Sequence, residues 1–148
     1  MITTSPTGGH RWGRRSEIID QNEVKQILAK HSQYLEDPTR GEKADLHAAD
    51  LTGVDLSGAD LTGADLTGVD LSDARLAGVR LHGAKLHRAN LHGANLAGAK
   101  LHRANLGAAD LSDAYMVNAD LHDADLSDAN LTGADLSSAD LTGAIGLP

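Results

Sequence analysis

The chain has 148 residues, about the length of one ordinary domain, and it contains no Cys, which excludes disulfide frameworks, thiolate zinc sites and cysteine chemistry. Only 2% of the residues are aromatic and 41% are hydrophobic, mostly Ala and Leu, so a regular repeat rather than an aromatic core is expected to fill the interior. The formal net charge of -8 disfavours nucleic acid as a direct partner.

No segment has the character of a membrane span or a signal peptide. The longest apolar run is Ala114 to Val117, whereas a membrane-spanning helix needs about 20 apolar residues. The polar start, residues 1–9, has no hydrophobic stretch of the kind that a signal peptide carries. The sequence therefore predicts a cytoplasmic protein that does not associate with membranes.

Residues 1–16 show no periodicity and combine small polar residues with three arginines, Arg11, Arg14 and Arg15. This composition is typical of a flexible leader. The next segment, residues 17–43, is expected to be a helix and a linker. The helix is expected to start from Ser16 or Asp20, and Pro38 with Gly41 ends it. Its apolar residues recur at spacings of three and four: Val24, Ile27, Leu28, His31 and Leu35.

From Ala44 to Gly143 the chain divides into twenty pentapeptides without an insertion. The third residue is Leu in every pentapeptide except one, which has Met116, and the first residue is Ala or, three times, Val. A five-residue period fits neither a helix nor a strand. It fits a chain that turns every five residues and holds its first and third residues inward. Successive coils then pair their backbones about 4.8 Å apart.

The motif A(D/N)LXX, seen here as ADLTG, ANLHG and ADLSD, resembles the pentapeptide-repeat proteins. The resemblance implies an all-β fold, a right-handed quadrilateral parallel β-helix with four pentapeptides in each coil. Residues 44–148 would then form a solenoid of about five coils. On this interpretation the helix within residues 17–43 caps the first coil, whose interior and unpaired backbone groups would otherwise be exposed.

The other end of the solenoid, from Ala144 to Pro148, has no such cover in the sequence. Members of the family often dimerise at this end, so the resemblance implies a homodimer through the last coil. The candidate dimer residues are Leu141, Ala144 and Ile145. A frayed end, or a chain cut from a longer one, is the alternative.

Charge is sorted along the repeat. Residues 45–73 carry seven Asp and no base, residues 75–103 carry six bases and no acid, and residues 110–140 carry eight Asp and no base. The bases are Arg75, Arg80, Lys85, Arg88, Lys100 and Arg103. If residues twenty apart stack, five of these six bases lie beside an Asp. They are either solvated pairs that hold the register or a basic belt that receives an acidic protein partner.

Two function classes follow from this rod. The first is a non-catalytic protein-interaction or scaffold module. The alternative, which the resemblance to gyrase-protecting members implies, is a DNA-mimicking modulator of DNA gyrase or topoisomerase. A DNA mimic needs a continuous acidic track, and the six bases invert the sign of the charge in the middle of the chain. The central Phe and the protruding loop of those members are also absent here.

Two sets of polar side chains are candidates for metal binding or catalysis, and neither is expected to form such a site. His82, His102 and His122 are twenty apart and form a ladder, but the ladder contains no carboxylate, so no metal is expected. Ser72, His92 and Ser112 also stack, with Asp110 alongside, yet they lie on an outward face without a pocket. The sequence therefore predicts no catalytic residue, no cofactor and no enzyme.

One outward face differs from the others. It carries small residues beside the central residues from Leu56 to Leu136, and Tyr115 replaces the Asp or Asn expected there. An exposed aromatic side chain on a flat surface favours protein contact. The candidate protein-contact residues are Tyr115, Val117, Arg80, Arg88, Lys100 and Arg103.

Overall fold

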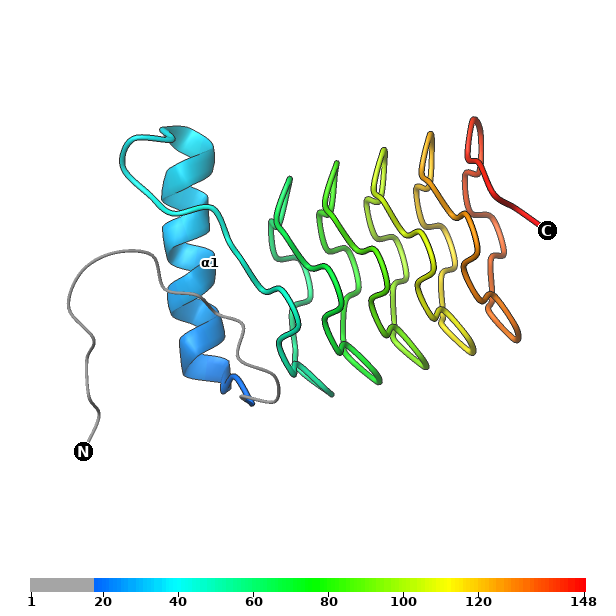
Figure 1. Cartoon of the computed structure of the whole chain (residues 1–148), viewed down its shortest axis with the longest axis horizontal. Helices are drawn as coiled ribbons and strands as arrows, with labels where there is room; N and C mark the ends of the chain where they lie inside the picture. The colour runs from blue at the N-terminus through cyan, green and yellow to red at the C-terminus, as the bar shows by residue number, and fades with distance from the viewer. Residues whose placement is uncertain (1–17) are drawn as a thin grey trace.

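The computed structural model describes residues 18–148, so the leader expected over residues 1–16 lies outside the described part. Helix α1 spans Gln21–Glu36. After it the chain forms a series of turns joined by isolated parallel bridges, and residues 18–148 contain no strand longer than one bridge. Figure 1 shows α1 at one end of a rod, with the coils following along the long axis to the C-terminus.

Helix α1 begins where the sequence provides a capping box. The carboxylate of Asp20 accepts hydrogen bonds from the amides of Asn22 and Glu23, at 2.8 and 2.9 Å. The carboxylate of Glu23 accepts the amide of Asp20 at 3.1 Å, which completes the box. The helix ends at Glu36, before the predicted breakers, and its buried residues are Val24, Ile27 and His31. Leu35, which was assigned to the same face, is 38% exposed because the helix ends one residue later.

Within the rod, a pentapeptide whose second residue is Asp or Asn uses all of its backbone donors in hydrogen bonds. In residues 64–68, the Ala64 amide closes a turn on the preceding pentapeptide, and the Asp65 amide donates to the previous coil. The amides of Leu66 and Gly68 donate to carbonyls of the next coil, at 2.8 and 2.9 Å. The remaining amide, of Thr67, donates to the carboxylate of Asp65 at 3.0 Å. Single bridges are enough here because no amide of this pentapeptide is left without a partner.

Bridges join residues twenty apart, as in Asp60 with Arg80, and a turn occurs every five residues, so four pentapeptides make one coil. The fifth residue of all twenty pentapeptides has a positive φ, between 55° and 74°. Glycine occupies half of these positions, whereas Ala108, Arg88 and Arg103 are among the others. A non-glycine residue in this region costs about 1–2 kcal/mol. The coil geometry therefore overrides the local preference for Gly, Asn and Asp in this backbone conformation.

The interior is filled by the first and third residues of the pentapeptides, as predicted. Every central residue from Leu46 to Leu126 is at most 3% exposed. In the last coil, Leu131, Leu136 and Leu141 are only partly buried. The rod is thus closed along its sides and open at its C-terminal end.

At the N-terminal end, α1 and the residue before its cap supply donors to carbonyls that a preceding coil would otherwise have satisfied. The amide of Ile19 donates to the Asp50 carbonyl at 3.3 Å, and the side chain of Gln21 donates to the Asp55 carbonyl at 3.1 Å. His31, which is fully buried, lies 3.0 Å from the Thr62 carbonyl through Nε2. Its Nδ1 accepts the amide of Ala44 at 3.0 Å, so Nε2 carries the proton and donates to Thr62.

His31 predicts a pH dependence of stability. Burial lowers the pKa of His31, and the hydrogen bond to Thr62 opposes this effect. As the pH falls, the unfolded chain binds the proton first, so the stability that depends on His31 is complete above about pH 6.5 and declines below it. We expect His31→Gln, whose amide has one acceptor and one donor, to reduce this decline in urea unfolding between pH 7.5 and pH 5.

The matched variants separate titration from packing. His31→Ala leaves two backbone groups unpaired and should lose about 1–3 kcal/mol at every pH. Ser32→Ala, at the next and exposed position of α1, should leave stability unchanged. An equal pH slope in the wild type and in His31→Gln would contradict the assignment.

Candidate functional site

The four pentapeptides of each coil give the rod four faces. We name each face after its first central residue: the Leu46, Leu51, Leu56 and Leu61 faces. Each face contains the pentapeptides at intervals of twenty residues, and its second residues are joined by the bridges. The Leu51 and Leu61 faces are opposite each other because they are two pentapeptides apart in a coil of four.

The Leu51 face carries acids and no Lys or Arg. Its ionisable side chains are Asp50, Asp70, Asp73, Asp110, Asp113 and His92, and its pentapeptides at residues 89–93 and 129–133 contain no acid. Asn90 and Asn130 occupy the gaps in this ladder and donate to Asp70 and Asp110, both at 3.2 Å. The acidic, basic, acidic order along the chain is therefore wrong for this face, because charges that are neighbours in sequence lie on different faces.

The basic belt, defined by the six bases between Arg75 and Arg103, occupies the other three faces. Three ion pairs join it to adjacent coils: Arg75–Asp55 at 3.8 Å, Arg80–Asp60 at 3.6 Å and Arg103–Asp123 at 3.8 Å. Lys85 and Lys100 are bridged to Asp65 and Asp120 through their backbones. Neither lysine forms an ion pair within 4.0 Å over residues 18–148. All six bases are exposed.

The belt replaces residues that stabilise the turns. In most pentapeptides the second residue is Asp or Asn, and its side-chain oxygen accepts the amide two residues later, as Asp60 does from Thr62 at 3.0 Å. Five pentapeptides lack this residue, and their second residues are Arg75, Arg80, Lys85, Lys100 and Tyr115. Each loses a hydrogen bond worth about 0.5–1.5 kcal/mol. Exposed ion pairs return only about 0–1 kcal/mol.

The same turn bonds keep the acids ionised. The hydroxyl of Ser112, and then its amide, lower the pKa of Asp110. Ser127 and Ser137 lower the pKa of Asp125 and Asp135 in the same way. These carboxylates are therefore charged across the physiological pH range.

The six predicted contact residues are exposed or partly exposed but do not form one surface. Tyr115, which is 46% exposed, and Val117 lie on the Leu56 face, where the Tyr115 backbone bridges to Asn95 and Asp135. Arg80, Lys100 and Arg103 lie on the adjacent Leu61 face, and Arg88 lies on the Leu46 face beyond it.

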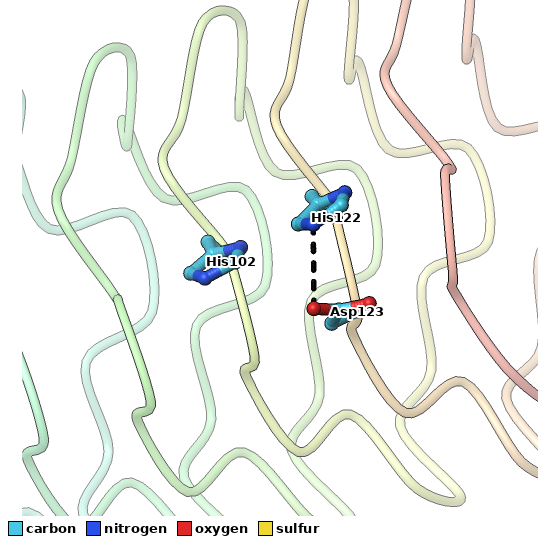
Figure 2. Close-up of side chains that lie close together, drawn as sticks. All are labelled: His102, His122 and Asp123. Atoms are coloured by element: carbon cyan, nitrogen blue, oxygen red, sulfur yellow. Dashed lines mark ion pairs between the residues drawn. The ribbon is translucent and has the colours of Figure 1, made fainter.

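The histidine ladder forms as the twenty-residue spacing requires. Ring centroids lie 4.8 Å apart for His82 and His102 and 4.9 Å apart for His102 and His122, and both pairs are stacked. The stacked positions contain no carboxylate, as the sequence predicts, but Asp123 lies beside the ladder. This residue follows His122 at the corner of the coil, and its Oδ2 lies 3.3 Å from His122 Nε2 (Figure 2).

The stacked Ser and His residues on the Leu51 face have hydrogen bonds that work against a catalytic role. Ser112 donates its hydroxyl proton to Asp110 at 2.6 Å, and Ser72 donates to Asp70 at 2.7 Å. His92 Nδ1 lies 2.9 Å from the Ser112 oxygen, and since that hydroxyl already donates to Asp110, His92 acts as the donor. Both serine hydroxyls are thus directed to the carboxylates that form the turns, and neither donates to His92.

The C-terminal coil exposes both apolar side chains and backbone donors. Ile145 is 58% exposed and Leu147 is 40% exposed, while Leu141 and Ala144 are partly buried. In the last coil, a set of third- and fifth-position amides makes no backbone hydrogen bond: Leu131, Gly133, Leu136, Ser138, Leu141 and Gly143.

The family described as pentapeptide repeats matches residues 42–78, 74–113 and 104–143, with 8 copies. No curated protein matches the chain. A pentapeptide repeat protein from the thylakoid lumen of Arabidopsis thaliana is similar, with a TM-score of 0.63 and 32% identity over 64% of this chain and 66% of that chain. A pentapeptide repeat protein from the cyanobacterium Cyanothece 51142 has a TM-score of 0.55 and 25% identity over 80% of this chain and 98% of that chain.

Trypsin-treated QnrB1, a plasmid-mediated fluoroquinolone resistance protein, is similar in fold, with a TM-score of 0.60 and 20% identity over 70% of this chain and 58% of that chain. The chain thus spans less than two thirds of QnrB1 and of the Arabidopsis protein. These relatives are right-handed β-helices, and the chain shares that fold. Among the described residues, no helix combines the length and the apolar character needed to cross a membrane. The cytoplasmic location stays a prediction.

The lost turn bonds predict the effect of restoring one. Arg80→Asn should place an acceptor beside the amide of His82 and replace a weak ion pair with a hydrogen bond, a net gain of about 0.5 kcal/mol in urea unfolding. Arg80→Asp restores the same bond but faces Asp60 in the adjacent coil, so it should be less stable than Arg80→Asn at low salt. A loss of stability in Arg80→Asn would show that the arginine supports the fold.

Proposed function

This chain belongs to the pentapeptide-repeat family, and we propose that it is a non-catalytic protein-interaction or scaffold module whose basic belt receives an acidic surface of a protein partner. One observation carries the proposal. Arg75, Arg80, Lys85 and Lys100 are exposed at positions where Asp or Asn would stabilise the turn. The exposed ion pairs of Arg75 and Arg80 offset the lost turn bonds only in part, and Lys85 and Lys100 form no ion pair within 4.0 Å over residues 18–148. A surface that breaks a local rule at a net cost in stability is expected to serve binding.

The finer architecture belongs to the same proposal. We infer five coils over the twenty pentapeptides and a capping role for α1, supported by the hydrogen bonds of Ile19, Gln21 and His31 to the first coil. A rod of this kind holds its exposed charges at spacings set by the coils, about 4.8 Å apart. It therefore presents a rigid pattern to a partner, and little conformational entropy is lost on binding.

The charge distribution supports an acidic protein over nucleic acid as the partner. The Leu51 face, which has no base, repels any polyanion that approaches from its side, and the opposite Leu61 face carries Arg80, Lys100 and Arg103. Such asymmetry orients a partner and raises its association rate more than its final affinity. The belt is too short to neutralise a long phosphate backbone, because acids flank it on the same face at Asp60, Asp120 and Asp140.

A capture experiment with reciprocal charge variants tests the proposal. The belt variant combines Arg80→Ala, Lys100→Ala and Arg103→Ala, and the control combines Asp73→Asn and Asp113→Asn on the Leu51 face. A partner enriched from native lysate by the wild type should bind the belt variant at least about tenfold more weakly, and the control equally well. Equal binding of the partner to both variants would contradict a role for the belt.

A second candidate, a DNA-mimicking modulator of DNA gyrase, is favoured by the Leu51 face, which carries five Asp and no Lys or Arg. This face offers five Asp over roughly 19 Å, where duplex DNA would offer about eleven phosphates. Because the charge density of this face is lower than that of DNA, we place the gyrase modulator second. In a supercoiling assay the control pair should then weaken the effect on gyrase, and the belt variant should keep it. An unaffected gyrase with the wild type removes this candidate.

We also propose self-association through the C-terminal coil. Along the open edge of this coil, amides without a backbone partner alternate with the carbonyls of the first positions. Two copies related by a two-fold axis would pair these edges as antiparallel strands do, each donating its amides to the carbonyls of the other. The exposed side chains of Ile145 and Leu147 would be buried at the same time. The N-terminal end takes no part because α1 already covers it.

Sedimentation should then give about twice the chain mass of 15.4 kDa. Ile145→Glu should produce a folded monomer, since it places a charge in the contact without entering the core. Gln26→Glu, at an exposed position of α1, should remain dimeric. A wild type that is monomeric at high micromolar concentration would rule out this interface.

A further inference from the structure

Two successive coils bring three metal-binding side chains together at one corner of the Leu61 face. His102 belongs to one coil, and His122 and Asp123 belong to the next (Figure 2). One nitrogen of each histidine and one carboxylate oxygen all lie within 4.8 Å of one another. The two imidazole rings are nearly parallel, with an interplanar angle of 7°. Both histidines are partly exposed and Asp123 is exposed, so solvent and ions reach the corner.

We propose that His102, His122 and Asp123 form a binding site for a divalent transition metal, with Zn²⁺ as the cation that suits them best. Two imidazoles and one carboxylate are ligands that zinc accepts, and water completes a tetrahedron. Hard cations such as Mg²⁺ prefer sites made wholly of oxygen and are poorly matched. The site belongs to the rod itself and does not depend on the protein partner or on gyrase.

The distances fit zinc after a small change. Ligand atoms about 2.0–2.1 Å from a tetrahedral zinc lie about 3.3 Å from each other. The His122 nitrogen and the Asp123 oxygen are already 3.3 Å apart. His102 must approach by about 1.5 Å and tilt its ring so that its lone pair points at the cation. Partly exposed side chains make this movement by rotating about their own torsions, without a change in the backbone.

The other outward histidines do not form a comparable set. His92 lies 4.0 Å from Asp113, but no second histidine stacks on it. His87 has the same position in its pentapeptide as His102 and lies on the Leu46 face, where its stacked neighbours are Thr67 and Gly107. Among the described residues, only the corner at His122 combines two adjacent imidazoles with a carboxylate.

Arg103 competes with the metal. Its Nε lies 3.8 Å from the same Asp123 oxygen that faces His122, and its charge repels a cation. Lys100 adds a second positive charge on this face, while Asp120 and Asp140 follow it in the second-position ladder and add negative charge. A metal ion at this site must therefore compete with Arg103 for the Asp123 carboxylate. Removal of Arg103 should strengthen binding, an effect opposite in sign to the removal of a ligand.

A bound ion would join one coil to the next, so its binding free energy adds to folding stability. Calorimetric titration of the full chain with Zn²⁺ at pH 7.5 should show one ion per chain and a raised melting temperature. His122→Ala and Asp123→Asn should each weaken binding at least about tenfold. Asn keeps the left-handed backbone that this position requires, and so changes only the ligand.

The matched variants decide the outcome. Arg103→Ala should tighten binding several-fold, and His87→Ala should leave it unchanged. All four substitutions are on the surface, and circular dichroism confirms that each variant is folded. Absence of zinc binding, or binding that survives in both His122→Ala and Asp123→Asn, would overturn the proposal.

Discussion

The hydrogen bond from the third-position amide to the second-position carbonyl of the next coil determines the rest of the structure. Because this bond recurs without interruption, as in Leu81 to Lys100 at 2.7 Å, residues twenty apart must be neighbours. The register then decides which charges share a face, which histidines stack and which side chains fill the interior. A slip of one pentapeptide would rotate every exposed residue to another face while leaving the Ala and Leu core intact. The arrangement of the exposed side chains, on which any function depends, is therefore set by the register of the coils and not by the packing of the core.

The sequence was sufficient for those features that depend on the period alone. The spacing of Leu predicted the interior, the apolar spacing near Val24 and Ile27 predicted α1, and the twenty-residue interval predicted the His102–His122 stack. Features at the corners were missed. Asp123 approaches His122 because the chain turns between them, and a pattern read along one ladder contains no information about such a turn. The acidic Leu51 face was missed for a related reason, since charge was sorted by chain position and not by face.

The two ends of the rod differ because a coil has direction. Each coil donates toward the C-terminal side through its third and fifth amides and toward the N-terminal side through its second amides, so the two ends present donors and acceptors in different proportions. Gln21 and His31 of α1 donate to carbonyls of the first coil, which supports the proposed capping role of the helix. At the other end, the third- and fifth-position amides from Leu131 to Gly143 make no backbone hydrogen bond. This difference is why the proposed self-association places two C-terminal ends together.

The regularity of the lattice explains why the surface of this rod is free to vary. A pentapeptide whose second residue is Arg or Lys still has its coil-to-coil bonds, so the loss of one turn bond at Arg80 or Lys100 is local and small against the burial of the Leu ladder. The same reasoning applies to the fifth positions, where Arg88 and Arg103 adopt a backbone that favours glycine. The lost turn bonds fall on four bases of the belt and on Tyr115, whereas two of the ten non-glycine residues with a positive φ, Arg88 and Arg103, belong to the belt. The backbone bonds between coils do not depend on bases at these positions, in keeping with the proposed role of the belt in recognising a partner.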